Sequence, residues 1–301
     1  MSAVFQQILI LYIFLTLGWL FGRLKKGLSE QATLLSFLTV NLFLPCKVFR
    51  SFSKNFTVDY IREYSSLLLA GVCFLILFVA LAIPLANLIS KKPYERRIYR
   101  YTLSISNYAY LGYVLAEELL GAAGLTNQIL FCIPFALYTY SFGYILLTGK
   151  DGSIKRLLNP MTVAILLGCI WGLTSLPVPA VLDQVITVSS NCVGPLSMLL
   201  TGLTLASFSM KGLVCNKAVY SVCALRLVLL PALTYGICRL LGLSTILPSA
   251  VLMACMPCGL NTIIFPRLIG EDCSIGARLA FVSHLFSCIT LPFWLLVILQ
   301  G

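Results

Sequence analysis

Residues 250–270 read AVLMACMPCGLNTIIFPRLIG, an apolar segment that carries Pro257 and Gly259 near its middle. A proline inside a helix removes one backbone hydrogen bond and clashes with the preceding turn, and a glycine loosens the same turn. Residues 101–121 read YTLSISNYAYLGYVLAEELLG, with polar residues and weak helix formers clustered around Asn107. We therefore predict that both segments form helices that are broken near their middles.

The rest of the chain is equally apolar. It is 59% hydrophobic and 10% charged, whereas soluble domains are about one quarter charged. Ten apolar stretches have lengths near the roughly 20 residues that cross a bilayer as a helix. They cover residues 3–22, 31–49, 64–89, 99–119, 127–148, 161–176, 183–206, 217–242, 246–269 and 276–299. The sequence predicts an all-α polytopic membrane protein with ten transmembrane helices, in which the broken segments are the fourth and the ninth.

The net charge of +11 comes from basic residues with an uneven distribution. Of the 21 lysines and arginines, 15 lie in loops that follow odd-numbered segments, which is not the pattern of a nucleic-acid-binding protein. The positive-inside rule places these loops in the cytoplasm and both termini outside it. The N-terminus has no basic n-region, so we expect the first segment to be a retained span of a multi-pass protein in the plasma or inner membrane.

The two halves of the chain share a pattern. Gly18, Gly22, Asn41 and Pro45 recur 150 residues later as Gly168, Gly172, Asn191 and Pro195. Five spans per half is an odd number, so residues 1–150 and 151–301 are predicted to be five-helix repeats of inverted topology. The same offset relates Asn107 to Pro257 and places both breaks at equivalent depths. Inverted repeats joined through broken helices are typical of secondary transporters. The sequence has one histidine and no zinc-protease, P-loop or nucleophile-elbow motif, so we do not expect an enzyme.

Two broken helices that cross would present free N–H groups and positive helix ends to an anion. The candidate substrate-binding residues at this crossing are Ser106, Asn107, Tyr108, Pro257, Gly259 and Asn261. The alternative is that Pro257 only kinks its helix and the asparagines bond to neighbouring backbone. No metal or cofactor is predicted.

Other polar residues within the apolar segments have two interpretations each. Asn41 and Asn191 either line the substrate path or pack the repeats together. Arg226 lies about nine residues into its segment, roughly 13 Å deep; it either neutralises a substrate anion or binds the carbonyls of a broken helix. His284 either carries a proton or is a hydrogen-bonded packing residue. Lys47 is expected to extend to the outer membrane surface.

The chain resembles the auxin efflux carrier family, which includes bacterial relatives of plant PIN-type carriers within the bile acid/arsenite/riboflavin transporter superfamily. The resemblance covers essentially the whole length. It rests on GRLKKGLSE with the following FLTVNLFLP, on SNYAYLGYVLAEELLGAAGL, on NPMTVAILLG, on GPLSMLLTGLTLAS and on MPCGLNTIIFPRLIGEDCSIGARLAFVSHLFSCITLP. Many members read closer to N-x-G-x-x-G-x-P in the fourth segment, so Tyr108 and Tyr110 are expected to alter the pocket here.

The resemblance implies a scaffold of segments one, two, six and seven, and a transport domain of segments three to five and eight to ten. It implies elevator-type export of a small organic anion across the lipid bilayer, with the crossing as the site. A sodium-coupled symporter like the related bile acid transporters and a non-transporting membrane sensor are the alternatives. A proton or a sodium ion is the candidate coupling ion, and a homodimer is the candidate assembly.

Overall fold

The computed structural model describes residues 2–25, 27–28, 32–149, 158–174, 176–208 and 217–300. These residues form helices and one isolated β-bridge. The helices of the first half are α1 (Ser2–Leu24), α2 (Ala32–Leu38), α3 (Leu44–Asn55), α4 (Val58–Ile89), α5 (Pro93–Ser104), α6 (Tyr113–Tyr138) and α7 (Tyr144–Thr148). Those of the second half are α8 (Pro160–Thr174), α9 (Ala180–Ala206), α11 (Lys217–Ala224), α12 (Leu230–Leu240), α13 (Leu247–Cys255), α14 (Asn261–Leu268) and α15 (Ser274–Gln300). The boundary predicted at residues 150 and 151 lies outside the described residues.

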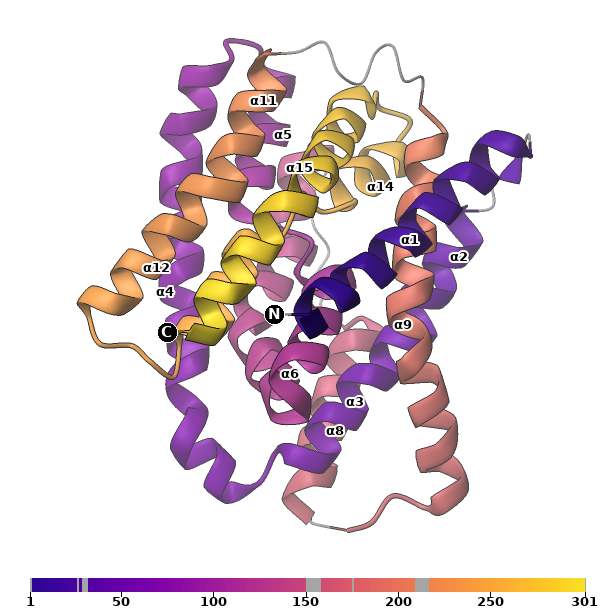
Figure 1. Cartoon of the computed structure of the whole chain (residues 1–301), viewed down its shortest axis with the longest axis vertical. Coiled ribbons are helices and arrows are strands. Elements are labelled where there is room, and N and C mark those ends of the chain that lie inside the picture. Colours follow the sequence, from indigo (N-terminus) through magenta and orange to yellow (C-terminus); the bar gives the residue numbers. More distant parts are fainter. Residues whose placement is uncertain are drawn as a thin grey trace.

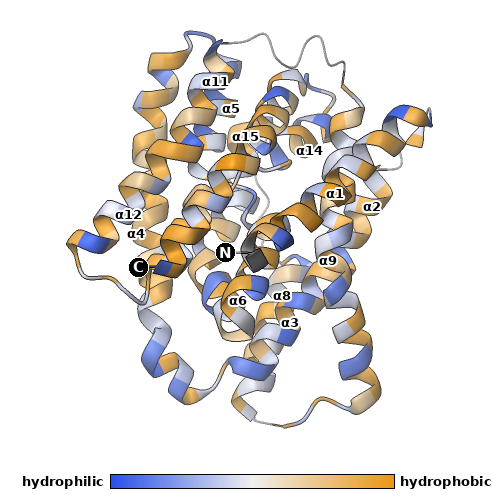
Figure 2. Cartoon of the chain, viewed as in Figure 1, coloured by the Kyte–Doolittle hydropathy of each residue, from blue (hydrophilic) through white to orange (hydrophobic). Residues whose placement is uncertain are grey.

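Seven helical stretches in the described part of the chain are long and apolar enough to cross a membrane. One of them, Tyr108–Thr148, has 41 residues, and it turns sharply at Gly121, where φ is 73° and ψ is −172°. Large apolar side chains such as Leu69 and Leu88 are 68% and 86% exposed, and apolar residues predominate along most of the helices (Figure 2). Soluble proteins rarely expose such continuous apolar surface, so this surface is suited to lipid.

Glycines allow the closest helix contacts. A Cβ atom added to Gly18 or Gly202 would overlap backbone atoms across the contact between α1 and α9. Additions at Gly168 or Gly172 would likewise overlap α3, against which α8 packs. The recurring glycine pairs, Gly18 with Gly22 and Gly168 with Gly172, therefore serve close helix approach, as is common for Gly-x-x-x-Gly pairs between membrane helices. Figure 1 shows α1, α2, α3, α8 and α9 on one side of the molecule and α4, α11 and α12 on the other.

Four π-helical turns interrupt the α-helices in the described residues. They are η2 (Thr39–Phe43), η3 (Tyr108–Gly112), η4 (Thr139–Gly143) and η6 (Leu225–Leu229). π-turns often occur at functional sites because they shift the direction of side chains and free backbone groups. Each of these turns carries a residue of the site described next.

Candidate functional site

The two broken segments meet in the middle of the molecule. After α5 ends, Ile105 is extended (φ −120°, ψ 131°), and after α13 ends, Met256 is extended as well (φ −65°, ψ 145°). Ser106 and Cys258 then pair as an antiparallel bridge. The backbone N–H of Asn107 donates to the Pro257 carbonyl at 2.8 Å. Both interruptions are thus present where the sequence predicts them, and they contact each other directly.

Gly259 favours this close approach, since an added Cβ would lie 3.2 Å from the Ser106 carbonyl oxygen, which is tighter than an ordinary van der Waals contact. Pro257 has no N–H group and therefore leaves the Met253 carbonyl, four residues earlier, without its helical donor. The Ser106 hydroxyl donates to that carbonyl at 2.9 Å. A residue of one broken segment thus supplies the hydrogen-bond donor for a carbonyl that the break in the other segment leaves free.

Arg226, on η6, is fully buried behind the crossing and binds carbonyls of both half-helices. Its Nη1 donates to the Leu103 carbonyl at 3.1 Å, its Nη2 to the Met253 carbonyl at 3.0 Å, and its Nε to the Met256 carbonyl at 3.3 Å. The last carbonyls of a helix lack intrahelical donors and carry partial negative charge, which favours a cation there. Of the two interpretations of Arg226, the structure therefore favours the one in which it binds the carbonyls of a broken helix.

A cavity of about 380 Å³ lies in front of the crossing. Its walls come from α2 and η2, from η3, from η4, from α9 and from α14. It reaches from Asn107, which is 3% exposed, to Arg267 at the exposed end of α14. Among the described residues that line the cavity, Arg267 is the one that is charged and none is a carboxylate.

Hydrogen bonds hold both asparagine amides of the crossing in place. His284 Nδ1 lies 2.7 Å from the Ala280 carbonyl, so in neutral histidine Nδ1 carries the proton and Nε2 is an acceptor. The Asn107 amide nitrogen lies 3.3 Å from Nε2 and donates to it. The Asn261 amide nitrogen donates to the Tyr101 hydroxyl at 3.0 Å. Both amides therefore have fixed orientations beside the cavity.

The comparison with known proteins identifies the family. A family model described as membrane transport protein matches residues 3–156 and 149–295, nearly the whole chain. The chain belongs to the auxin efflux carrier family of membrane transport proteins. It is therefore a transporter-family protein of the lipid bilayer, with a small molecule as substrate.

Two relatives of this auxin efflux carrier family protein are archaeal. An uncharacterized transporter of Methanothermobacter thermautotrophicus is 25% identical over 303 residues, which cover 97% of this chain and 98% of the relative. An uncharacterized transporter of Methanocaldococcus jannaschii is 26% identical over 311 residues, covering 95% and 96%. Neither name specifies a substrate, so the substrate class has to be argued from the site.

Most of the predicted site residues of this family member lie together. Ser106, Asn107, Tyr108, Gly259, Asn261 and Asn41 all line the cavity. Three others do not: Pro257 shapes the crossing, Arg226 lies behind it, and Asn191 is on an exposed face of α9. Tyr110, which was expected to alter the pocket, also lines the cavity, whereas the sequence did not indicate Ser36, Tyr140, Thr204 or Arg267. Arg267 had counted only as a loop charge, and no sequence signal separated Tyr140 or Thr204 from ordinary residues of apolar segments.

Lys47 departs from its prediction. It does not extend to the membrane surface but is 3% exposed, and its Nζ pairs with Oε2 of Glu117 on α6. A carboxylate from a distant segment supplies the counter-ion that allows the ammonium to stay buried.

Proposed function

We propose that this auxin efflux carrier family protein is a secondary active transporter for a small organic anion and that the cavity at the crossing is its substrate site. The observation that carries the proposal is the electrostatic character of the cavity. Two helix starts and Arg267 face it, and no carboxylate does so among its described residues. A cavity of about 380 Å³ is also within the usual size range of small-molecule sites.

Helix starts favour the negative sign of the substrate. The helical run of η3 and α6 begins after Asn107, and α14 begins at Asn261; both starts line the cavity. The first N–H groups of a helix have no intrahelical acceptor and carry partial positive charge. A carboxylate is well suited to such groups, whereas a cation would be repelled by them and by Arg267. The apolar walls, which include Phe37 and Leu200, suit the hydrocarbon part of an organic acid.

The repeat supports a ten-span, inverted architecture. If the sharp turn at Gly121 divides the 41-residue stretch, the described helices accommodate the fourth and fifth spans as separate crossings. Leu103 and Met253, both ligands of Arg226, are 150 residues apart, as are Asn107 and Pro257, which share a hydrogen bond. Contacts between equivalent positions are what a two-fold axis between inverted repeats requires.

We infer an elevator-type mechanism from the same arrangement. The scaffold would comprise α1, α2, α3, α8 and α9, and the transport domain would comprise the remaining helices with the crossing. The cavity is open at Arg267, at the end of α14 that leads into a loop assigned to the cytoplasm by the charge distribution, with both termini outside the cell membrane. An anion would therefore enter from the cytoplasm in this conformation, which suits an exporter.

A thermal-shift screen of the purified protein against dicarboxylates, keto acids and indole acids tests the substrate class. We expect at least one acid to stabilise the wild type and Asn107→Ala to reduce the response. Arg62→Ala, which changes an exposed residue in the turn of helix at the start of α4, is the control and should respond as the wild type does. If no acid stabilises the wild type, or if Asn107→Ala responds equally, the proposed site is wrong.

Counterflow of the labelled acid in proteoliposomes then separates the mechanisms. Dependence on sodium would favour the symporter alternative, and dependence on an imposed pH gradient would identify a proton as the coupling ion. Binding without counterflow would favour a sensor.

A further inference from the structure

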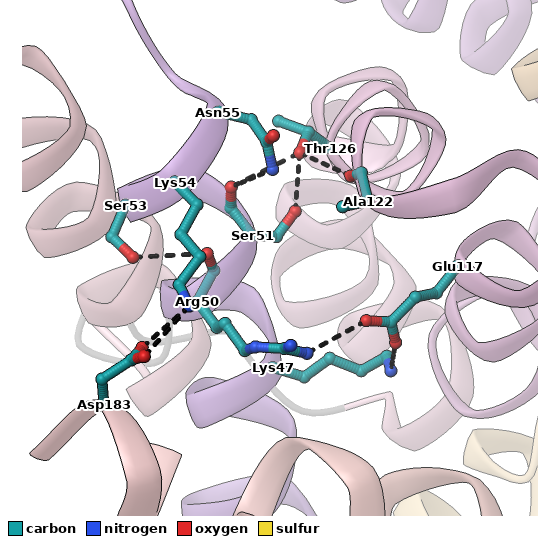
Figure 3. Close-up of polar contacts among 10 residues, drawn as sticks. All are labelled: Lys47, Arg50, Ser51, Ser53, Lys54, Asn55, Glu117, Ala122, Thr126 and Asp183. Atoms are coloured by element: carbon teal, nitrogen blue, oxygen red, sulfur yellow. Dashed lines mark hydrogen bonds and ion pairs between the residues drawn. The ribbon is translucent and has the colours of Figure 1, made fainter. Parts of the chain in front are cut away.

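A second cluster of charges is centred on α3 and includes carboxylates from α6 and α9 (Figure 3). Arg50 Nη1 is 3.2 Å from Glu117 Oε1, and Lys47 Nζ pairs with the other oxygen of the same carboxylate. One turn further along α3, Lys54 pairs with Asp183 of α9 at 3.0 Å. The cluster therefore contains three cations and two carboxylates, and one carboxylate is shared by two cations.

The cluster continues from the substrate cavity. Leu44, in the first turn of α3, lines the cavity, and Lys47 lies three residues later on the same helix face. The open end of the cavity, at Arg267, is formed by α14 instead. Lys47, Arg50 and Glu117 thus stand at the end of the cavity that is closed in this conformation.

Glu117 and the two cations belong to different groups of helices. Glu117 is on α6, in the helical run that begins after Asn107 and precedes the turn at Gly121. Lys47 and Arg50 are on α3, which packs along α8 and α9. A movement of the crossing relative to α3 would therefore carry Glu117 away from both cations.

We propose that Lys47 and Arg50 form a second carboxylate site, which Glu117 fills in this conformation and the transported anion fills after Glu117 has moved away. This proposal rests on the proposed function, since it assigns the same substrate to a second position on its path. Glu117 acts as a built-in carboxylate that closes one end of the path. The released anion then passes from the crossing to the cations of α3.

Burial of the ammonium explains why another anion must replace Glu117. The Lys47 side chain is 4% exposed, against 45% for Lys54, so it depends far more on a counter-ion. Removing one partner of a buried ion pair leaves an uncompensated charge, which is strongly unfavourable. A conformation without Glu117 at this place therefore attracts a free carboxylate.

The cluster also has unused binding capacity. Arg50 Nε is buried and has no hydrogen-bond partner among the described residues. A small cavity of about 50 Å³ adjoins it, lined by Lys47, Arg50, Ser51, Lys54, Asn55 and Glu117 among others. The planar guanidinium can bind a carboxylate through two parallel N–H groups, only one of which is used by Glu117. This geometry selects carboxylates over spherical anions such as chloride.

The proposal is tested by measuring how tightly the Glu117→Gln variant binds succinate. Thermal shift at constant ionic strength reports the binding, with chloride as the reference anion. The Glu117 carboxylate is tethered and competes with succinate at an effective concentration of about millimolar or more. Its removal should therefore lower the apparent Kd for succinate at least about tenfold. Glu118→Gln is the matched control, because it makes the same charge change at the adjacent, exposed residue. It should bind succinate as the wild type does.

Adding Lys47→Met to Glu117→Gln should abolish the gain, whereas adding Asn107→Ala should preserve it. If Glu117→Gln unfolds in chloride, succinate during purification should restore the folded protein. The proposal is overturned if Glu117→Gln binds succinate no better than Glu118→Gln, if the gain survives Lys47→Met, or if succinate gives no rescue. The first site is tested separately by asking whether an organic acid stabilises the wild type and whether Asn107→Ala loses this stabilisation. The two proposals can therefore fail independently.

Discussion

Replacing Arg226 with methionine is expected to loosen the crossing of the two broken helices. The guanidinium donates to the carbonyls of Leu103, Met253 and Met256, which come from both segments. Methionine has a similar length and can fill the space, but it offers no donor. The variant therefore removes the hydrogen bonds while leaving the volume of the core almost unchanged.

The cost can be estimated from the carbonyls that lose a donor. Met253 keeps the hydroxyl of Ser106 at 2.9 Å, so the carbonyls of Leu103 and Met256 are the two affected. Each buried acceptor left without a donor costs about 1–3 kcal/mol, or about 2–6 kcal/mol for both. Removing a buried guanidinium relieves its desolvation, so we expect a net loss of about 2–4 kcal/mol in the free energy of unfolding.

Reversible unfolding in a titration with sodium dodecyl sulfate measures this difference. Arg226→Lys should have an intermediate effect, because an ammonium retains the charge but cannot reach three carbonyls in the geometry of the guanidinium. Arg239→Met, an exposed position on α12, is the control and should change the free energy by no more than about 0.5 kcal/mol. A free energy for Arg226→Met within about 0.5 kcal/mol of the wild type would show that these hydrogen bonds do not hold the crossing.

Three further predictions concern other parts of the fold. His284→Gln retains an acceptor for the Asn107 amide and should preserve most counterflow, whereas His284→Leu should lose it; equal loss in both variants would instead identify the imidazole as a proton carrier. Hydrogen bonds from the Ser274 hydroxyl and amide lower the pKa of Asp272. The ionised Asp272 side chain therefore stabilises the fold at pH values above its unfolded pKa of about 3.9, and this stabilisation is lost as the pH falls through the lower folded pKa. Asp272→Ala, which removes the acceptor of the Ser274 amide, should cost about 1 kcal/mol at pH 7 and less in strong acid, measured as unfolding stability against pH; equal stability of the variant and the wild type at pH 7 would contradict this. Gly202→Ala should destabilise the α1–α9 contact by about 1–3 kcal/mol, whereas Gly236→Ala, where the added methyl meets no atom within 4 Å, should be neutral or stabilising in the same titration.

The breaks were predictable because their causes are local. Pro257 cannot donate to the Met253 carbonyl, and Gly259 loosens the turn that follows, so together they favour a departure from helical geometry at residues 256–260. Around Asn107 the signal was weaker, since serine, asparagine and tyrosine only lower helix propensity. The break predicted at Pro257, 150 residues after Asn107, supported the prediction of a break at Asn107.

The hydrogen-bond and ion-pair partners of the buried charges could not be predicted, because these partners are distant in sequence. The depth of Arg226 in its segment indicates that it needs partners, but it does not separate a substrate from the carbonyls of Leu103 and Met253. Lys47 is near a segment end, where extension to the surface is the default, and its counter-ion is 70 residues away on Glu117. The sequence places each charge along its own helix, whereas pairing depends on how helices rotate against each other.

The four π-turns were missed for a related reason. A π-turn adds one residue to a helical turn without changing the composition of an apolar segment, so hydropathy does not reveal it. Its effect is on direction: side chains after the turn face a different way from those that a regular helix predicts. This accounts for Tyr140, which lies in η4 and reaches the cavity although nothing in its neighbourhood is unusual.

The distribution of polar contacts indicates which parts of the molecule move together. At the crossing, Arg226 and Ser106 donate to the carbonyls that the two breaks leave without helical donors. The backbone N–H of Asn107 donates directly to the Pro257 carbonyl of the other segment. Separating these groups would leave several buried acceptors without donors, so the crossing is expected to remain intact during transport. Between α3 and α6 the polar contacts are a shared carboxylate and a pair of hydroxyls, beside a small cavity, and these can be exchanged for water or for an anion. An alternating movement therefore costs least if the crossing shifts as one body along α3, because the charges of that interface can find new partners and the carbonyls of the crossing cannot.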